Sequence, residues 1–134
     1  IQSRYPNNLR SLITFSSDLA SKIYCSSDMF LMPSKFEPCG LSQMIAMRYG
    51  TLPIVRETGG LKDTVIPYDY TTGQGTGFTF YSYNAYDLLN AIERTVGMYR
   101  DYKEDWFKIV NNAMKQDFSW ENISLRYIDL YKQL

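Results

Sequence analysis

A short apolar strand, joined to an amphipathic helix by a turn with proline and glycine, constrains this sequence more than any other feature. The stretch Asp28-Met-Phe-Leu-Met-Pro33 predicts a buried parallel strand, because four apolar residues precede a proline that cannot continue the ladder. A helix is predicted to begin between Pro38 and Gly40, because apolar residues then recur at helical spacing, namely Leu41, Met44, Ile45 and Tyr49. The first N–H groups of a helix lack internal partners and the helix dipole is positive there, so this turn predicts an anion site.

Strands and helices alternate on both sides of this turn. Residues 11–15 predict a short apolar strand, and Ser16, Ser17 and Asp18 are N-cap candidates for the helix that follows it. Residues 51–56 predict the next strand, which runs into a Thr58-Gly-Gly-Leu61 turn. This order, β-α-β-α-β, indicates a parallel sheet.

The second half of the chain is expected to add one strand and three helices. Residues 67–77 are rich in Gly, Thr, Tyr and Asp and predict a flexible loop before a short strand at 77–80. Asn84 is expected to cap the first helix and Ser119 the third, while Trp106 and Ile109 mark the apolar face of the second.

Composition excludes several classes of protein. The 134 residues are enough for one small domain with a real core. Fourteen basic residues balance fourteen acidic ones, so no net field recruits nucleic acid or an anionic membrane. No transmembrane or secretion signal is visible. Histidine is absent, which excludes an imidazole base and most zinc sites, and Cys25 and Cys39 are expected to be free thiols.

Several long strings together resemble one enzyme family. They are Phe36-Glu-Pro-Cys-Gly-Leu41, Ala46-Met-Arg-Tyr-Gly50, Val55-Arg-Glu-Thr-Gly-Gly-Leu-Lys-Asp-Thr-Val65, Gly77-Phe-Thr-Phe80 and Gln116-Asp-Phe-Ser-Trp-Glu121. This set closely resembles the glycogen and starch synthases, which are retaining glycosyltransferases of the two-domain GT-B fold. The resemblance covers essentially the whole chain.

The resemblance implies a fold of class α/β, a partial doubly wound (Rossmann-like) parallel sheet with C-terminal helices. Residues 1–134 would be a single partial domain, the C-terminal part of the GT-B nucleotide-sugar-binding domain, and residues 117–134 its closing helix. In the family, two further strand-helix units with a basic Arg/Lys pair come first. Without them strand 11–15 has no natural neighbour, so we expect this exposed sheet edge to re-pair internally or to self-associate.

The implied activity is transfer of glucose from ADP-glucose or UDP-glucose to the non-reducing end of an α-1,4-glucan, with retention. The glucan acceptor would bind through the N-terminal domain, so this chain alone is expected to be inactive. No cofactor and no metal are implied. A bacterial source would place the enzyme in the cytoplasm, and a plant source in a plastid.

The resemblance implies several site residues, first of all those that would hold the donor phosphate and the catalytic carboxylate. The amides of Gly40, Leu41 and Ser42 would hold the distal phosphate of the donor, unless this is a plain helix start with Ser42 facing water. Glu37 would be the catalytic carboxylate, stabilising positive charge at the anomeric carbon. The simpler alternative is a carboxylate placed before a helix for dipole reasons alone.

The remaining candidates have equally simple structural explanations. Phe15 either stacks on the nucleotide base or is an ordinary core residue. Thr58, Gly59 and Gly60 either let backbone approach the donor or form a tight connection. Lys35 matches a basic position of the motif or is a solvated charge. Many GT-B enzymes place a ribose-binding glutamate where this chain has Ile45, so the ribose contact is unassigned.

Two other functions remain open. One is another retaining GT-B glucosyltransferase, which the Glu-Pro-Cys-Gly and Thr-Gly-Gly-Leu strings disfavour. The other is a noncatalytic nucleotide- or glucan-binding module. A Rossmann dehydrogenase is disfavoured because the chain has no Gly-x-Gly-x-x-Gly turn.

Overall fold

Three short parallel strands form the centre of the computed structural model, which describes all residues 1–134. They are β1 (Met29–Met32), β2 (Leu52–Arg56) and β3 (Phe78–Phe80), in the order β1-β2-β3. The register sets Leu31 opposite Ile54 and Ile54 opposite Phe78. The strands expected near 28–32, 51–56 and 77–80 are therefore confirmed, as is the parallel sheet.

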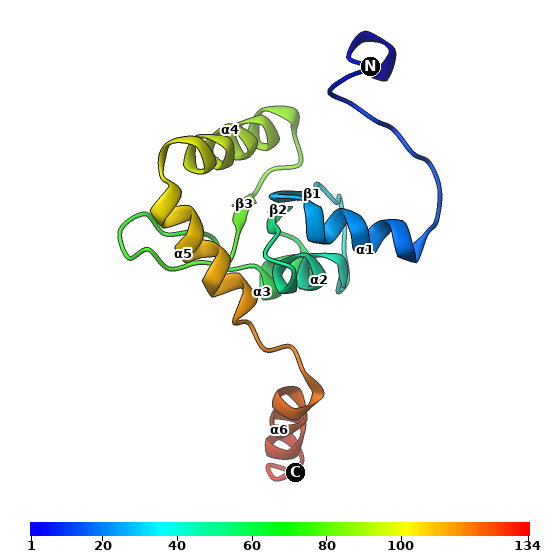
Figure 1. Cartoon of the computed structure of the whole chain (residues 1–134). Helices are drawn as coiled ribbons and strands as arrows, with labels where there is room; N and C mark the ends of the chain where they lie inside the picture. The colour runs from blue at the N-terminus through cyan, green and yellow to red at the C-terminus, as the bar shows by residue number, and fades with distance from the viewer.

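Helices cover both faces of this sheet. In Figure 1, α4 (Ala85–Asp101) lies above the strands, whereas α2 (Ser42–Arg48) and α3 (Gly59–Thr64) lie below them. Helix α4 contacts β2 and β3, and α2 contacts β1 and β2. Helix α5 (Lys103–Met114) packs against α4, α2 and β2. Because β2 is covered on both sides, its residues 52–55 are all buried, as expected for a central parallel strand.

The hydrophobic core joins β2 and β3 to α3, α4 and α5. Three aromatic rings of β3, α4 and α5 pack together in this core. The centre of the Trp106 ring lies 5.0 Å from that of Tyr99, edge to face, and 6.3 Å from that of Phe78. The largest buried apolar side chains include Met47, Leu52, Leu61 and Ile109. The core therefore spans residues 46 to 113 and leaves both chain ends outside it.

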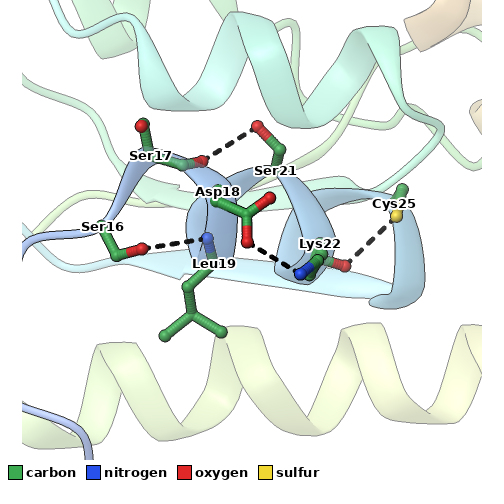
Figure 2. Close-up of polar contacts among 7 residues, drawn as sticks. All are labelled: Ser16, Ser17, Asp18, Leu19, Ser21, Lys22 and Cys25. Atoms are coloured by element: carbon green, nitrogen blue, oxygen red, sulfur yellow. Dashed lines mark hydrogen bonds and ion pairs between the residues drawn. The ribbon is translucent and has the colours of Figure 1, made fainter.

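Local hydrogen bonds explain where two of the helices begin. The Ser16 hydroxyl accepts a hydrogen bond from the Leu19 N–H at 3.2 Å at the start of α1 (Ser17–Ser26), and Lys22 pairs with Asp18 one turn apart (Figure 2). Asn84 caps α4 in the same way, accepting from the Asp87 N–H at 2.9 Å. Both expected caps are confirmed.

The expected cap Ser119 differs. It stands at the N-cap position of α6 (Trp120–Tyr131), but its hydroxyl accepts no hydrogen bond from the helix. Its N–H donates instead to the Asp117 carboxylate at 2.9 Å, and hydrogen bonds from Ser119 hold the pKa of Asp117 below its usual value.

The expected strand at 11–15 is wrong. These residues form no strand, and Figure 1 shows the N-terminal segment running away from the sheet toward a single 3₁₀ turn (Gln2–Arg4). Strand β1 pairs with β2 alone, so residues 11–15 leave its other edge unpaired, and the Ser11 N–H donates instead to the Gln2 side chain at 2.6 Å. The apolar pattern of 11–15 is therefore left in water, with Ile13 and Phe15 almost fully exposed.

The expected apolar face of α2 is only partly correct. Met44 packs against the core, but Leu41, Ile45 and Tyr49 are exposed, whereas Gln43, Ala46 and Met47 are completely buried. The buried stripe thus includes one small and one polar residue where α2 contacts the sheet, α3 and α5. Strand β1 is likewise less buried than expected, with Leu31 44% exposed, because it has a neighbour on one side only.

Helix α6 stands apart from the rest of the molecule in Figure 1 and contributes no buried residue. Its exposed apolar side chains are Trp120, Leu125, Tyr127, Ile128, Leu130, Tyr131 and, just beyond it, Leu134. None of the helices is both long enough and apolar enough to cross a membrane.

Candidate functional site

The turn between β1 and α2 lies at the carboxyl end of the sheet, where parallel α/β folds bind ligands. It extends from Pro33 to Leu41 without regular structure, and α2 begins at Ser42. Gly40 has φ of 74°, a left-handed conformation that glycine adopts without strain. The helix therefore starts two to four residues later than expected, after Gly40.

This turn contains a run of N–H groups without a hydrogen-bond partner in the protein. No backbone N–H from Cys39 to Met44 donates a hydrogen bond within the protein, and the first such bond of the helix joins the Ile45 N–H to the Leu41 carbonyl at 3.0 Å. The three amides predicted to hold phosphate, those of Gly40, Leu41 and Ser42, all fall inside this run. The geometry leaves them available to an anion.

Gly59 and Gly60 press directly on the backbone of the same turn. A Cβ atom added to Gly59 would meet the Glu37 carbonyl at 2.1 Å, and one added to Gly60 would meet the Cys39 carbonyl at 2.1 Å. The Gly60 N–H donates to the Glu37 and Pro38 carbonyls, each at 3.2 Å. Thr58 is the N-cap of α3, so the expected turn at 58–61 is in fact the start of a short helix that docks on the 37–39 backbone.

Gln43 binds the backbone of the turn from helix α2, and the sequence analysis did not identify it as a site residue. It is 0% exposed, and its Nε2 donates to the Gly40 carbonyl at 2.8 Å, the Thr64 hydroxyl at 3.0 Å and the Cys39 carbonyl at 3.1 Å. Its Oε1 is buried without a partner, which costs about 1–3 kcal/mol. The available signal was its helical spacing, because Gln43 lies three and four residues before the buried Ala46 and Met47 and therefore on the same face of α2.

Arg56 was also missed, although it stands at the carboxyl end of the central strand. Its guanidinium donates to the carbonyls of Ser34, Lys35 and Tyr81, and it lies 5.6 Å from the centre of the Tyr83 ring. It thus ties the turn after β1 to the segment after β3. A charged residue directly after an apolar strand was the available signal.

Glu37 is half-buried, and its carboxylate takes part in none of the ion pairs of the chain. Its backbone carbonyl is fixed by Gly60, so the main chain is held while the side-chain oxygens keep their acceptor capacity. Lys35 is exposed, and its carbonyl is one of those that bind Arg56. The turn therefore presents one unpaired carboxylate beside the unpaired amides.

Phe15 is not brought to this turn. Its side chain is 98% exposed and makes no aromatic pair, so it is neither a core residue nor a platform in this structure. The reason is the missing strand at 11–15, which was expected to place the ring at the carboxyl edge of the sheet. The prediction that Phe15 contacts a nucleotide base stays a prediction.

One hollow of the surface, about 540 Å³, does not lie at this turn. It lies beside the C-terminal half of α2 and the segment after α5, and its lining includes Arg48, Lys115 and Asp117. A second hollow, about 330 Å³, begins at Pro33, the first residue of the turn, and Tyr83 also lines it.

The parallel sheet and the amide-lined turn at its carboxyl edge define a ligand-binding α/β domain. The family model described as glycosyl transferases group 1 matches residues 5–112. Because this match covers most of the chain, the protein belongs to the glycosyl transferases group 1 family.

Curated relatives agree with the resemblance seen in the sequence. The chain is 55% identical over 130 residues to glycogen synthase of Desulfitobacterium hafniense, covering 97% of this chain and 28% of that enzyme. It is 52% identical over 132 residues to glycogen synthase of Clostridioides difficile, covering 98% of this chain and 27% of that enzyme. The chain therefore spans little more than a quarter of the length of these relatives.

Solved structures agree as well. The catalytic domain of starch synthase IV from Arabidopsis thaliana, bound to ADP and acarbose, matches with a TM-score of 0.86 and 40% identity over 98% of this chain and 28% of that chain. Sucrose-phosphate synthase from Thermosynechococcus elongatus matches with a TM-score of 0.69 and 27% identity, over 98% of this chain and 32% of that chain. The predicted fold class, part of a doubly wound parallel sheet with C-terminal helices, is confirmed.

The contact between Gly60 and the turn predicts a steric requirement. Gly60→Ala should lower the free energy of unfolding by about 3 kcal/mol, because its Cβ would meet rigid backbone. Gly97→Ala is the matched control, since a Cβ there meets nothing within 4 Å and alanine favours a helix by up to about 1 kcal/mol. Urea unfolding of both variants measures the difference, and equal stability of Gly60→Ala and wild type would contradict the contact.

Proposed function

We propose that this chain is the donor-binding part of a glycogen or starch synthase-type enzyme. That enzyme transfers glucose from ADP-glucose or UDP-glucose to the non-reducing end of an α-1,4-glucan with retention. The observation that supports this most directly is the half-buried Glu37 next to the unpaired amides of residues 40–42. The glycogen synthases among the relatives, and the ADP bound to the similar starch synthase, support the substrate class.

Each part of the turn has a role in this reaction. The amides of Gly40, Leu41 and Ser42 bind the distal phosphate and stabilise the charge that develops on it as the glycosidic bond breaks. Glu37 accepts hydrogen bonds from the glucose hydroxyls and stabilises the oxocarbenium-like carbon. Thr58, Gly59 and Gly60 form the donor-site loop, in which the two glycines let the backbone approach the donor closely. Phe15 supplies the platform for the base once a neighbouring strand orders residues 11–15.

The rest of the enzyme supplies what this chain does not hold. The glucan acceptor binds through an N-terminal domain, and a basic Arg/Lys pair completes the diphosphate grip. Residues 1–134 act as one partial domain, and residues 117–134 close it. The proposed location is the cytoplasm of a bacterium, in line with the bacterial relatives, and this chain by itself has no transferase activity.

Substitution of the proposed catalytic carboxylate tests the mechanism. In the complete enzyme, Glu37→Gln should lower kcat by about 10²-fold while the donor affinity changes little, because the charge matters most in the transition state. Glu93→Gln, on the exposed face of α4, is the matched control and should keep full activity. Steady-state kinetics with ADP-glucose and UDP-glucose measure both, and an unchanged kcat in Glu37→Gln would remove this residue from the mechanism.

Ligand titration separates this function from its rivals. ADP or UDP added to the isolated chain should shift the amide resonances of Glu37 and of residues 39–42, because the distal phosphate binds at the turn. Maltooligosaccharide alone should shift none of them, since the acceptor binds elsewhere. Glucan binding without nucleotide binding would favour a noncatalytic glucan-binding module, and activity with a different acceptor would favour another retaining GT-B glucosyltransferase.

The open edge of β1 should also make the isolated chain self-associate. This edge pairs with no strand, and Leu31 on it is 44% exposed. Light scattering should show a mass that rises with concentration, and Leu31→Lys should reduce the rise by placing a charge at the edge. A strict monomer at every concentration would refute this proposal.

A further inference from the structure

We propose that Gln43 is a positioning residue, whose buried amide holds the Glu37–Gly40 turn in the shape that the donor site requires. It touches neither the donor nor the reacting atoms and acts through the backbone of the turn. This inference rests on the proposed function for its kinetic consequence, whereas the contacts that carry it are properties of the fold itself.

The orientation of the Gln43 amide is fixed by its neighbours. Nε2 faces the Cys39 and Gly40 carbonyls, which can only accept hydrogen bonds. The Thr64 hydroxyl donates its own hydrogen to the Gly60 carbonyl at 2.6 Å, so toward Gln43 it acts as an acceptor. Exchanging the oxygen and nitrogen of the amide would set an oxygen against three acceptors. The side chain therefore has one satisfactory orientation.

These bonds close a ring between the turn and α3. Gln43 binds the Cys39 and Gly40 carbonyls and Thr64, Thr64 binds Gly60, and the Gly60 N–H returns to the Glu37 carbonyl at 3.2 Å. The ring binds the carbonyls of the turn, whereas the N–H groups of residues 40–42 keep no partner within the protein. A change at Gln43 is thus transmitted to Glu37 and to the amides.

The donor group of Gln43, rather than its oxygen, explains a glutamine at this position. Its Oε1 is buried without a partner, but an apolar side chain of the same length would leave the Cys39 and Gly40 carbonyls without the donor that they have now. A Cβ at residue 40 would lie 2.5 Å from the Oε1, and the φ of 74° there also favours glycine. Buried polar groups with an unmet bond are typical of sites where shape is held for function.

The test uses the complete protein that contains this chain and compares three variants. Gln43→Met keeps the length of the side chain and loses the donor, so kcat/KM for the nucleotide-sugar should fall by about 10- to 100-fold, as expected when a site shifts by up to an ångström. The KM for glucan should stay within about twofold, because the acceptor binds elsewhere. Thr64→Val, which removes the hydroxyl, should lose activity in the same direction. Thr64→Ser, which keeps it, should restore kcat/KM to within about twofold of wild type.

Hydrogen exchange in the same proteins separates this inference from the proposed function. The Gly60 amide should exchange at least about tenfold faster in Gln43→Met, whereas amides in α4 should not change. Wild-type kcat/KM in a folded Gln43→Met protein would overturn the positioning role. An equal rise in the KM for the nucleotide-sugar and in the KM for glucan would also overturn it. Failure of the proposed function itself would appear separately, as unchanged kcat in Glu37→Gln.

Discussion

The approach of two backbones, without any side chain between them, is the constraint on which the rest of this structure depends. The start of α3 lies so close to the 37–39 segment that neither Gly59 nor Gly60 has room for a Cβ atom. This contact is possible because β1 and β2 are adjacent and parallel, so the turns that follow them leave the sheet at the same edge. The shape of the Glu37 turn is therefore set by neighbouring main chain rather than by its own sequence.

Two side chains also hold the backbone of the turn, one from each side. Gln43 holds the carbonyls of Cys39 and Gly40 from the α2 side, and Arg56 holds those of Ser34 and Lys35 from the end of β2. Once most of the carbonyls of a turn are bound on the protein side, its N–H groups are the backbone groups left for a ligand. Hydrogen-bond accounting alone thus predicts that this turn binds an acceptor-rich group such as phosphate.

The sequence predicted the sheet and the turn well, because both depend on local patterns. Apolar runs ended by Pro33 and by the Thr58-Gly-Gly turn mark the strands, and the cap at Asn84 is a local signal. Residues 11–15 have the same apolar pattern but do not pair with the open edge of β1, so propensity alone did not form a strand there. The face of α2 was mispredicted because apolar residues were counted as inward, whereas close approach to α3 and the sheet favours Ala46 and the bonded Gln43. Arg56 and Gln43 were missed because their partners are backbone carbonyls, which no side-chain motif reveals.

The division between buried and exposed parts of the chain explains why the site geometry is independent of the unpaired segments. Everything that shapes the turn falls between Pro33 and Thr64, and it includes the fully buried Gln43, Leu52 and Leu61. The unpaired apolar surfaces, which are residues 12–15, the outer edge of β1 and helix α6, lie outside this network. The hydrogen bonds that join Gln43, Thr64 and Gly60 to the turn all lie within the chain. Protein segments that cover the unpaired surfaces would therefore extend the site without changing the shape of the turn. The unpaired amides are in this sense a local property of 32 consecutive residues, 33 to 64.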